Sequence, residues 1–124
     1  MWAAMIRWLV RRRQSFGYAF SGLVYMLRTQ PHAQVHLLAV VVVVSAGCLT
    51  GLAPTEWVVL ILSMALVLSL EAMNTALEAL ADALHPSHHP LVGKAKDLAA
   101  AAVLVSALAS VIIGTLIFIP HWLS

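Results

Sequence analysis

The sequence predicts an all-α integral membrane protein in which an amphipathic surface helix precedes three transmembrane helices. Three observations predict this class. Of the 124 residues, 62% are hydrophobic and only 10% are charged, whereas soluble domains carry about 25% charged residues. No charged residue occurs between Arg28 and Glu56, nor from Leu98 to Pro120. The apolar residues before Arg28 instead recur at helical spacing. At this length we expect a single domain over residues 1–124.

Residues 1–30 are expected to form a helix that lies in the membrane interface. Two sets of apolar residues recur with the period of one helix face: Trp2, Met5, Ile6 and Leu9, then Phe16, Phe20, Leu23 and Leu27. The arginines of the chain all lie in this segment, where they suit an anionic membrane surface. Gly17 is expected to bend or break the helix. The alternative is an ordinary bundle helix packed on the others. No small-residue cleavage site follows, so we expect no cleaved signal peptide.

Three apolar stretches follow, at about 32–52, 56–84 and 95–120, and each supplies roughly the 20 residues that a bilayer needs. Lysine and arginine placement predicts their orientation. The arginine-rich start and the segment with Lys94 and Lys96 should face the cytoplasm. The turn at 51–56 has no lysine or arginine and should face outward. Three spans then place the carboxyl terminus outside as well.

Small residues mark expected helix contacts. They recur every fourth position in the third span, at Ala102, Ser106, Ser110 and Gly114, and Gly47 and Gly51 form one GxxxG pair. Such stripes let helices approach closely in lipid. Whether these contacts join helices of one chain or of several chains is open from the sequence.

Polar residues gather on one face of the second span. Glu71, Asn74, Glu78 and Asp82 lie at i, i+3, i+7 and i+11, which covers an arc of roughly 80° at about 100° per residue. A charge at the centre of a membrane helix costs about 2.5–3.5 kcal/mol, so a function is favoured over chance, although Asp82 alone could lie among headgroups. Carboxylate and amide oxygens suit a general base and hard ligands for Mg²⁺.

Cations follow this acidic face in Gly93-Lys94-Ala95-Lys96-Asp97. Metal, carboxylate base and lysine together indicate a phosphoryl-transfer site at the membrane surface. The segment is not a P-loop, because His88 and Ala95 stand where that motif needs a glycine and a hydroxyl residue. The histidines of the preceding loop lack an obvious fourth zinc ligand, so a loop near nucleotide is favoured over a zinc site; they are His85, His88 and His89.

The motif Glu71-x-x-Asn74-Thr75-Ala76-x-Glu78-x-x-x-Asp82, the His/Pro loop and Gly93-x-Ala95-Lys96-Asp97 resemble the bacterial diacylglycerol kinase and undecaprenol kinase family. The resemblance extends upstream through Phe16-Gly17-Tyr18, Gly22, the turn at Arg28 and His36, so it covers nearly the whole chain. It implies a lipid kinase of the bacterial inner membrane that transfers the γ-phosphoryl group of MgATP to diacylglycerol or undecaprenol. The Asn-Thr-Ala form of the motif looks nearer to the undecaprenol branch.

The resemblance further implies a homotrimer whose active sites combine residues of neighbouring protomers. Glu71 would be the catalytic base and Glu78 a metal ligand. Gln30 stands where the family's archetype has a second metal-binding glutamate, and it can ligate through its carbonyl oxygen but brings no charge. The positions implied to bind ATP are Arg11, Tyr18, Gln30, Asn74, Glu78, Asp82, Ser87, His89, Lys96 and Asp97.

Two other classes remain as alternatives. A small oligomeric transporter that relays protons or cations would explain an intramembrane Glu71 but not the adjacent Lys96-Asp97 pair. A structural membrane subunit without chemistry is disfavoured by the acidic face. Nucleic acid is not an expected partner, because the apolar remainder of the chain leaves no soluble domain to present the arginines.

Overall fold

A computed structural model describes all 124 residues and contains four α-helices and no strand. They are α1 (Trp2–Thr29), α2 (Pro31–Thr50), α3 (Pro54–Leu84) and α4 (Pro90–Leu123). By length and apolar composition α2, α3 and α4 are each able to cross a membrane. The predicted all-α class with three membrane-spanning helices is therefore confirmed.

Proline sets the start of each of these three helices. It occupies a first-turn position of α2, α3 and α4, where its fixed φ suits a helix and its missing N–H is not needed. Proline also disfavours helical backbone in the residue before it, and Gln30, Ala53 and His89 are accordingly extended. The ring Nδ1 of His89 accepts a hydrogen bond from the Leu91 amide at 3.1 Å. This cap explains why α4 begins at Pro90 rather than at 95.

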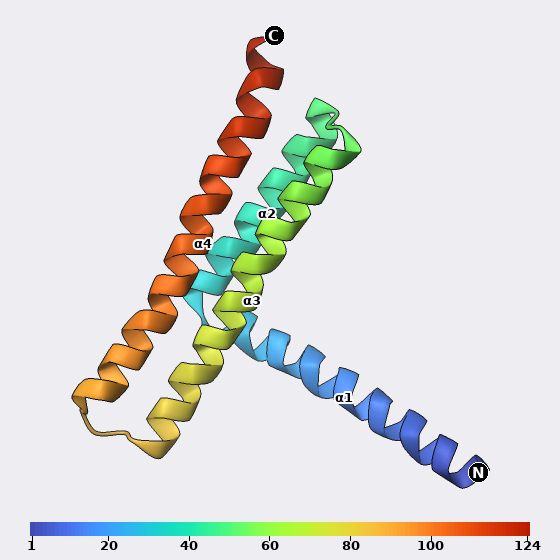
Figure 1. Cartoon of the computed structure of the whole chain (residues 1–124), viewed down its shortest axis with the longest axis vertical. Helices are drawn as coiled ribbons and strands as arrows, with labels where there is room; N and C mark the ends of the chain where they lie inside the picture. The colour runs from blue at the N-terminus through green and yellow to red at the C-terminus, as the bar shows by residue number, and fades with distance from the viewer.

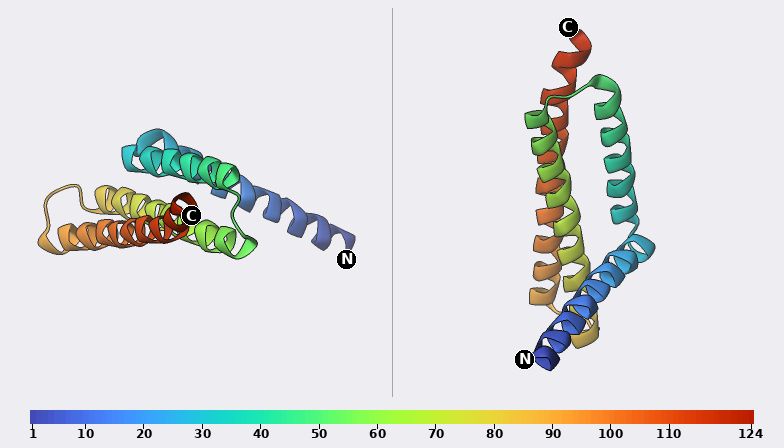
Figure 2. Two further views of the ribbon diagram at one scale, coloured as in Figure 1. Left: turned by 90° about the horizontal axis from the view of Figure 1, so that it is seen from above. Right: turned by 90° about the vertical axis from the view of Figure 1, so that its right-hand side faces the viewer.

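Helix α1 runs without interruption from Trp2 to Thr29. The expectation that Gly17 bends or breaks it is wrong. A glycine inside a helix costs only about 1 kcal/mol relative to alanine and keeps its backbone N–H, so one glycine does not end a helix of 28 residues. The helix leaves the bundle obliquely (Figures 1 and 2), and all residues up to Leu23 are exposed.

Helices α3 and α4 pack along each other, and α2 stands beside this pair (Figure 2). Two members of the small-residue stripe on α4, Ser106 and Ser110, lie in the α3–α4 contact. Ser106 is buried, and the hydroxyl of Ser110 lies 3.4 Å from the backbone oxygen of Ser63 on α3. This middle part of the stripe thus joins two helices of the same chain.

The three spans differ in length. Helix α2 has 20 residues, whereas α3 has 31 and α4 has 34. His36 lies beside Glu71, and α2 begins five residues earlier, about 7.5 Å along its axis. Because α2 and α3 run in opposite directions, α3 extends past the start of α2 from about residue 76 onward. Glu71 therefore lies within the depth of α2, and Glu78 and Asp82 lie beyond it.

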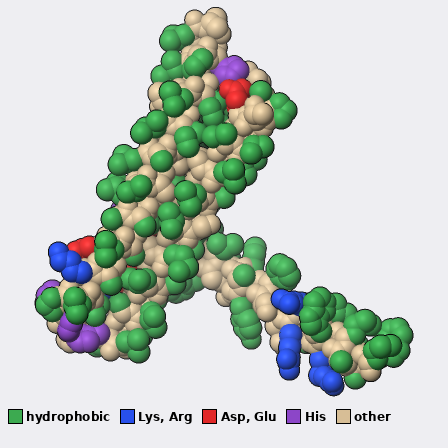
Figure 3. All heavy atoms as spheres, viewed as in Figure 1, with side chains coloured by type: hydrophobic (Ala, Val, Ile, Leu, Met, Phe, Trp, Pro, Cys, Tyr) green, Lys and Arg blue, Asp and Glu red, His purple; other side chains and the backbone are tan.

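The two ends of the bundle are distinct (Figure 1). The α3–α4 loop and the α1–α2 junction lie toward one end, and the α2–α3 turn and the carboxyl terminus lie at the other. In Figure 3, basic side chains gather on α1 and near the loop. The direction of the bundle across the membrane stays a prediction.

Candidate active site

Glu71 is the most deeply buried ionisable residue of α3. Its residue exposure is 2%. The hydroxyl of Thr75, one turn further on, donates to the Glu71 backbone oxygen at 2.9 Å and leaves the carboxylate free. The nearest ionisable partner is on another helix: Nε2 of His36 lies 3.8 Å from Oε2 of Glu71. A carboxylate buried in the apolar part of a membrane helix bundle is costly in free energy and is typical of a functional site.

Asn74 and Glu78 continue the same face toward the end of α3. The Asn74 amide nitrogen donates to Oε1 of Glu78 at 3.4 Å. The Asn74 amide oxygen is buried and has no hydrogen-bond partner, although buried polar atoms are normally paired. An unpaired acceptor beside a carboxylate fits a hard cation. No three His, Cys, Asp or Glu side chains gather into a metal cluster. Mg²⁺ leans on one or two carboxylates plus substrate phosphates and water, so a site for it does not require such a cluster.

An ion pair joins α3 to α4 on either side of the loop. Nζ of Lys96 lies 2.5 Å from Oδ1 of Asp82. The Asp82 side chain is 67% exposed, so the pair lies where a soluble nucleotide can reach it. Asp97 is also exposed at this end.

The loop between α3 and α4 has its own local contacts. Nδ1 of His85 lies 2.9 Å from the backbone oxygen of Ser87, and the His85 and His89 rings meet edge to face, with centroids 5.1 Å apart. Because Nδ1 of His89 accepts the capping hydrogen bond, its neutral ring carries the proton on Nε2. Nε2 of His89 is thus a hydrogen-bond donor available to an anion.

The remaining predicted residues lie apart from this site within a single chain. Arg11 and Tyr18 are two turns apart on exposed α1. The Gln30 side chain, at the α1–α2 junction, contacts the Thr29 hydroxyl at 3.4 Å and makes no hydrogen bond to Glu78. The fold thus gathers Glu71, Asn74 and Glu78 on α3, and brings Asp82 to Lys96. It leaves the α1 residues separate, and all these site assignments stay predictions.

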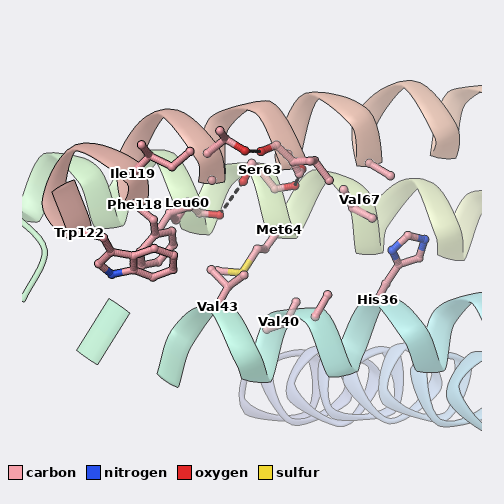
Figure 4. A pocket seen from close by; sticks show the side chains of 16 residues that line it. His36, Val40, Val43, Leu60, Ser63, Met64, Val67, Phe118, Ile119 and Trp122 are labelled. Carbon is pink, nitrogen blue, oxygen red and sulfur yellow. Dashed lines mark hydrogen bonds between the residues drawn. The ribbon is translucent and has the colours of Figure 1, made fainter. Parts of the chain in front are cut away.

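A cavity of about 520 Å³ lies between α2, α3 and α4. Figure 4 shows His36 at one end and Trp122 at the other. Most of its lining is apolar, and its polar lining groups other than His36 and Trp122 are the hydroxyls of Ser63, Ser110 and Thr115. His36 therefore touches both Glu71 and an apolar space.

His36 was not among the predicted site residues. Its partner Glu71 lies on another helix, and that pairing depends on how α2 packs against α3. The available signal was one ionisable side chain one turn inside an apolar helix, which is by default a functional candidate in a membrane protein.

Comparison with known proteins decides the family. The sequence profile described as prokaryotic diacylglycerol kinase matches residues 17–118. The chain belongs to the prokaryotic diacylglycerol kinase family. The predicted identification and the predicted lipid kinase activity are thereby confirmed, and the transporter alternative is not supported.

Members of the diacylglycerol kinase family match over most of the chain. An undecaprenol kinase of Bacillus subtilis is 42% identical over 107 residues, which is 86% of this chain and 87% of the relative. A diacylglycerol kinase of Synechocystis is 41% identical over 89% of this chain and 63% of its own longer sequence. The diacylglycerol kinase of Escherichia coli is 31% identical over 86% and 87%.

Proposed function

We propose that this kinase transfers the γ-phosphoryl group of MgATP to the hydroxyl of a membrane lipid alcohol at the cytoplasmic face of the bacterial inner membrane. The supporting observation is the polar face of α3. It has a carboxylate buried within the apolar depth of the bundle, at Glu71. Next comes Asn74, whose amide nitrogen donates to Oε1 of Glu78 and whose amide oxygen is unpaired. The Asp82–Lys96 pair lies at the exposed end. The order runs from the lipid side to the nucleotide side.

The chemistry follows from that order. The Glu71 carboxylate takes the proton of the lipid hydroxyl, the lipid oxygen attacks the γ-phosphorus, and the β–γ bridging oxygen leaves with ADP. Lys96 lies where its ammonium would meet the phosphates. Glu78 and the Asn74 amide oxygen would hold Mg²⁺, with Gln30 as a further candidate. When bound, the metal would offset charge on the phosphates.

The acceptor is diacylglycerol or undecaprenol. Identity does not separate the two, since relatives named for each acceptor match at 42% and 41%. The cavity does not separate the two acceptors either. Its lining on α4 extends from Ala107 to Trp122, about 22 Å along the helix, which suits one acyl chain as well as part of a polyprenyl chain.

We also propose that the active protein is a homotrimer with sites shared between protomers. Within one chain Arg11 and Tyr18 are exposed on α1, and the Gln30 side chain makes its hydrogen bond to Thr29 rather than to the α3 face. A neighbouring protomer's α1 could complete the nucleotide site.

The test is a transfer assay. Purified protein in mixed micelles is incubated with Mg²⁺, γ-labelled ATP and either diacylglycerol or undecaprenol. We expect label in the lipid fraction, and the ratio of kcat/KM for the two lipids identifies the preferred acceptor. A protein that labels neither lipid would contradict the proposed function.

A further inference from the structure

His36 is placed between the buried Glu71 carboxylate and the interhelical cavity. Its Nε2 lies 3.8 Å from Oε2 of Glu71, and its ring lines the end of the cavity nearest to Glu71 (Figure 4). The side chain of His36 is 21% exposed, whereas that of Glu71 is only 3% exposed. His36 is thus the more accessible member of the pair.

A buried general base has to lose its proton before it can act again. Glu71 has little contact with water, and the Thr75 hydroxyl beside it already donates to the Glu71 backbone oxygen. Helix α4 brings only hydroxyl-bearing and apolar side chains and the Trp122 indole to the cavity, and no ion pair joins His36 to α1 or α4. The imidazole of His36 is therefore the base placed to accept this proton.

We propose that His36 accepts the proton that Glu71 removes from the lipid hydroxyl. This inference rests on the proposed function. In the transfer step the acceptor's O–H bond breaks, its proton goes to the Glu71 carboxylate, and its oxygen bonds to the γ-phosphorus. The β–γ bridging oxygen departs on ADP with the bonding electrons. The proton then passes from the Glu71 carboxyl to unprotonated Nε2 of His36 and on to water, so that no other reactant is needed.

The distance of 3.8 Å is longer than a hydrogen bond, which needs about 2.7–3.2 Å. Catalytic hydrogen bonds are often long without substrate and tighten in the reacting complex. The proposed transfer requires His36 and Glu71 to approach to hydrogen-bond distance in the reacting complex. Because His36 acts through Glu71, it is a positioning and proton-accepting partner of the base.

The test compares His36→Ala with His32→Ala, which removes the same side chain one turn away on the exposed surface of α2. We expect His36→Ala to lower kcat by about 10²-fold, the low end of the range of about 10²–10⁴-fold for acid–base groups, with an unchanged KM for ATP. Added imidazole should restore part of the lost turnover. His32→Ala should keep wild-type kcat and show no response to imidazole.

His36→Gln covers the case in which the alanine variant does not fold. Glutamine keeps a polar side chain but its amide does not act as a base, so we expect a folded protein with slow turnover. The thermal unfolding temperature checks that the variant is folded. Wild-type turnover in His36→Gln would overturn the inference and leave His36 a structural role. Loss of activity in His36→Ala without imidazole rescue would also overturn it. If the wild-type protein phosphorylates neither lipid, the proposed function itself fails.

Discussion

Glu71 lies where the surroundings of α3 change from apolar to polar. Residues before it on α3 line the apolar cavity, as Val67 does, and residues after it lead to Asn74 and Glu78. It lies level with His36, inside the start of α2. In the proposed reaction the lipid hydroxyl and the soluble nucleotide meet at a boundary between apolar and polar surroundings, and Glu71 lies at such a boundary.

Glu71→Gln is expected to lower kcat by about 10²–10⁴-fold while ATP binding and folding persist. The change removes the proton acceptor but keeps the size and hydrogen-bonding capacity of the side chain. Single-turnover transfer and ATP binding, measured on the same preparation, separate the two effects. Near-normal lipid phosphorylation by the variant would mean that Glu71 is not the general base.

Lys96→Met is expected to raise KM for ATP and lower kcat, on the order of 10²-fold for the loss of a donor to developing charge. The substitution also releases Asp82, the carboxylate that Lys96 holds, toward the phosphates. Lys94→Met is the matched control, because Lys94 is exposed on the same turn of α4. Equal effects in both variants would mean that Lys96 acts only through general surface charge.

Gln30→Glu is expected to lower the Mg²⁺ concentration for half-maximal activity, and Gln30→Ala to raise it. Mg²⁺ prefers carboxylate oxygens, and an added charge strengthens its binding without altering the fold. The Gln30 side chain has only a weak contact with Thr29, so the change costs little locally. Identical Mg²⁺ midpoints for the wild type and the two variants would mean that Gln30 does not bind Mg²⁺ and serves only as the residue before Pro31.

The acidic residues could be predicted from the sequence because they lie on one helix, where spacing alone fixes the shared face. Pairs between helices could not. The His36–Glu71 contact and the ion pair between His121 and Glu56, 3.0 Å apart, depend on the packing of α2, α3 and α4. No local period in the sequence encodes which turn of one helix meets which turn of another.

At the scale of elements, the sequence predicted that small residues mark close contacts, and the packing gives this a specific form at Gly47. Gly47 is buried, and an added Cβ would lie 2.6 Å from the Trp57 ring. The indole of α3 thus packs directly on the backbone of α2. By contrast, Gly17 was predicted to interrupt α1 and does not. A Cβ added at Gly17 would meet nothing within 4 Å, so no close helix contact depends on this glycine.

Gly47→Ala is expected to destabilise the protein by about 1–3 kcal/mol, the usual cost of overpacking, since the rigid Trp57 ring has to move. The measurement is the thermal unfolding temperature in detergent. Gly114→Ala is the matched control on α4, where an added Cβ meets nothing within 4 Å. Equal unfolding temperatures for the wild type and Gly47→Ala would mean that the α2–α3 turn shifts to accommodate the added methyl group without loss of stability.

At the scale of the whole molecule, the end with the carboxyl terminus is closed by polar contacts between elements distant in sequence. His121 on α4 pairs with Glu56 at the start of α3, and the Trp122 indole N–H donates to the Thr50 hydroxyl at 3.1 Å. In Figure 3 a histidine and a carboxylate lie together at this end. The end with the α3–α4 loop carries the candidate site.

The topology is tested by labelling single cysteines in intact cells. In a Cys48→Ser background, we expect Ser87→Cys to react with an impermeant maleimide only after the cytoplasmic side is exposed. Ser124→Cys should react from outside. The reason is the clustering of arginine and lysine at the loop end, under the positive-inside rule. Labelling of both positions from one side would contradict three spans with this orientation.

The prolines at the starts of α2, α3 and α4 have a consequence for biogenesis. A helix whose first residue is fixed by local backbone chemistry does not need its neighbours in order to be positioned along the chain. Each span can therefore acquire its limits as it emerges from the ribosome and enter the bilayer before the next one is synthesised. On the polar face of α3 only Asp82 has its partner on α4, so this ion pair forms last, after α4 has followed.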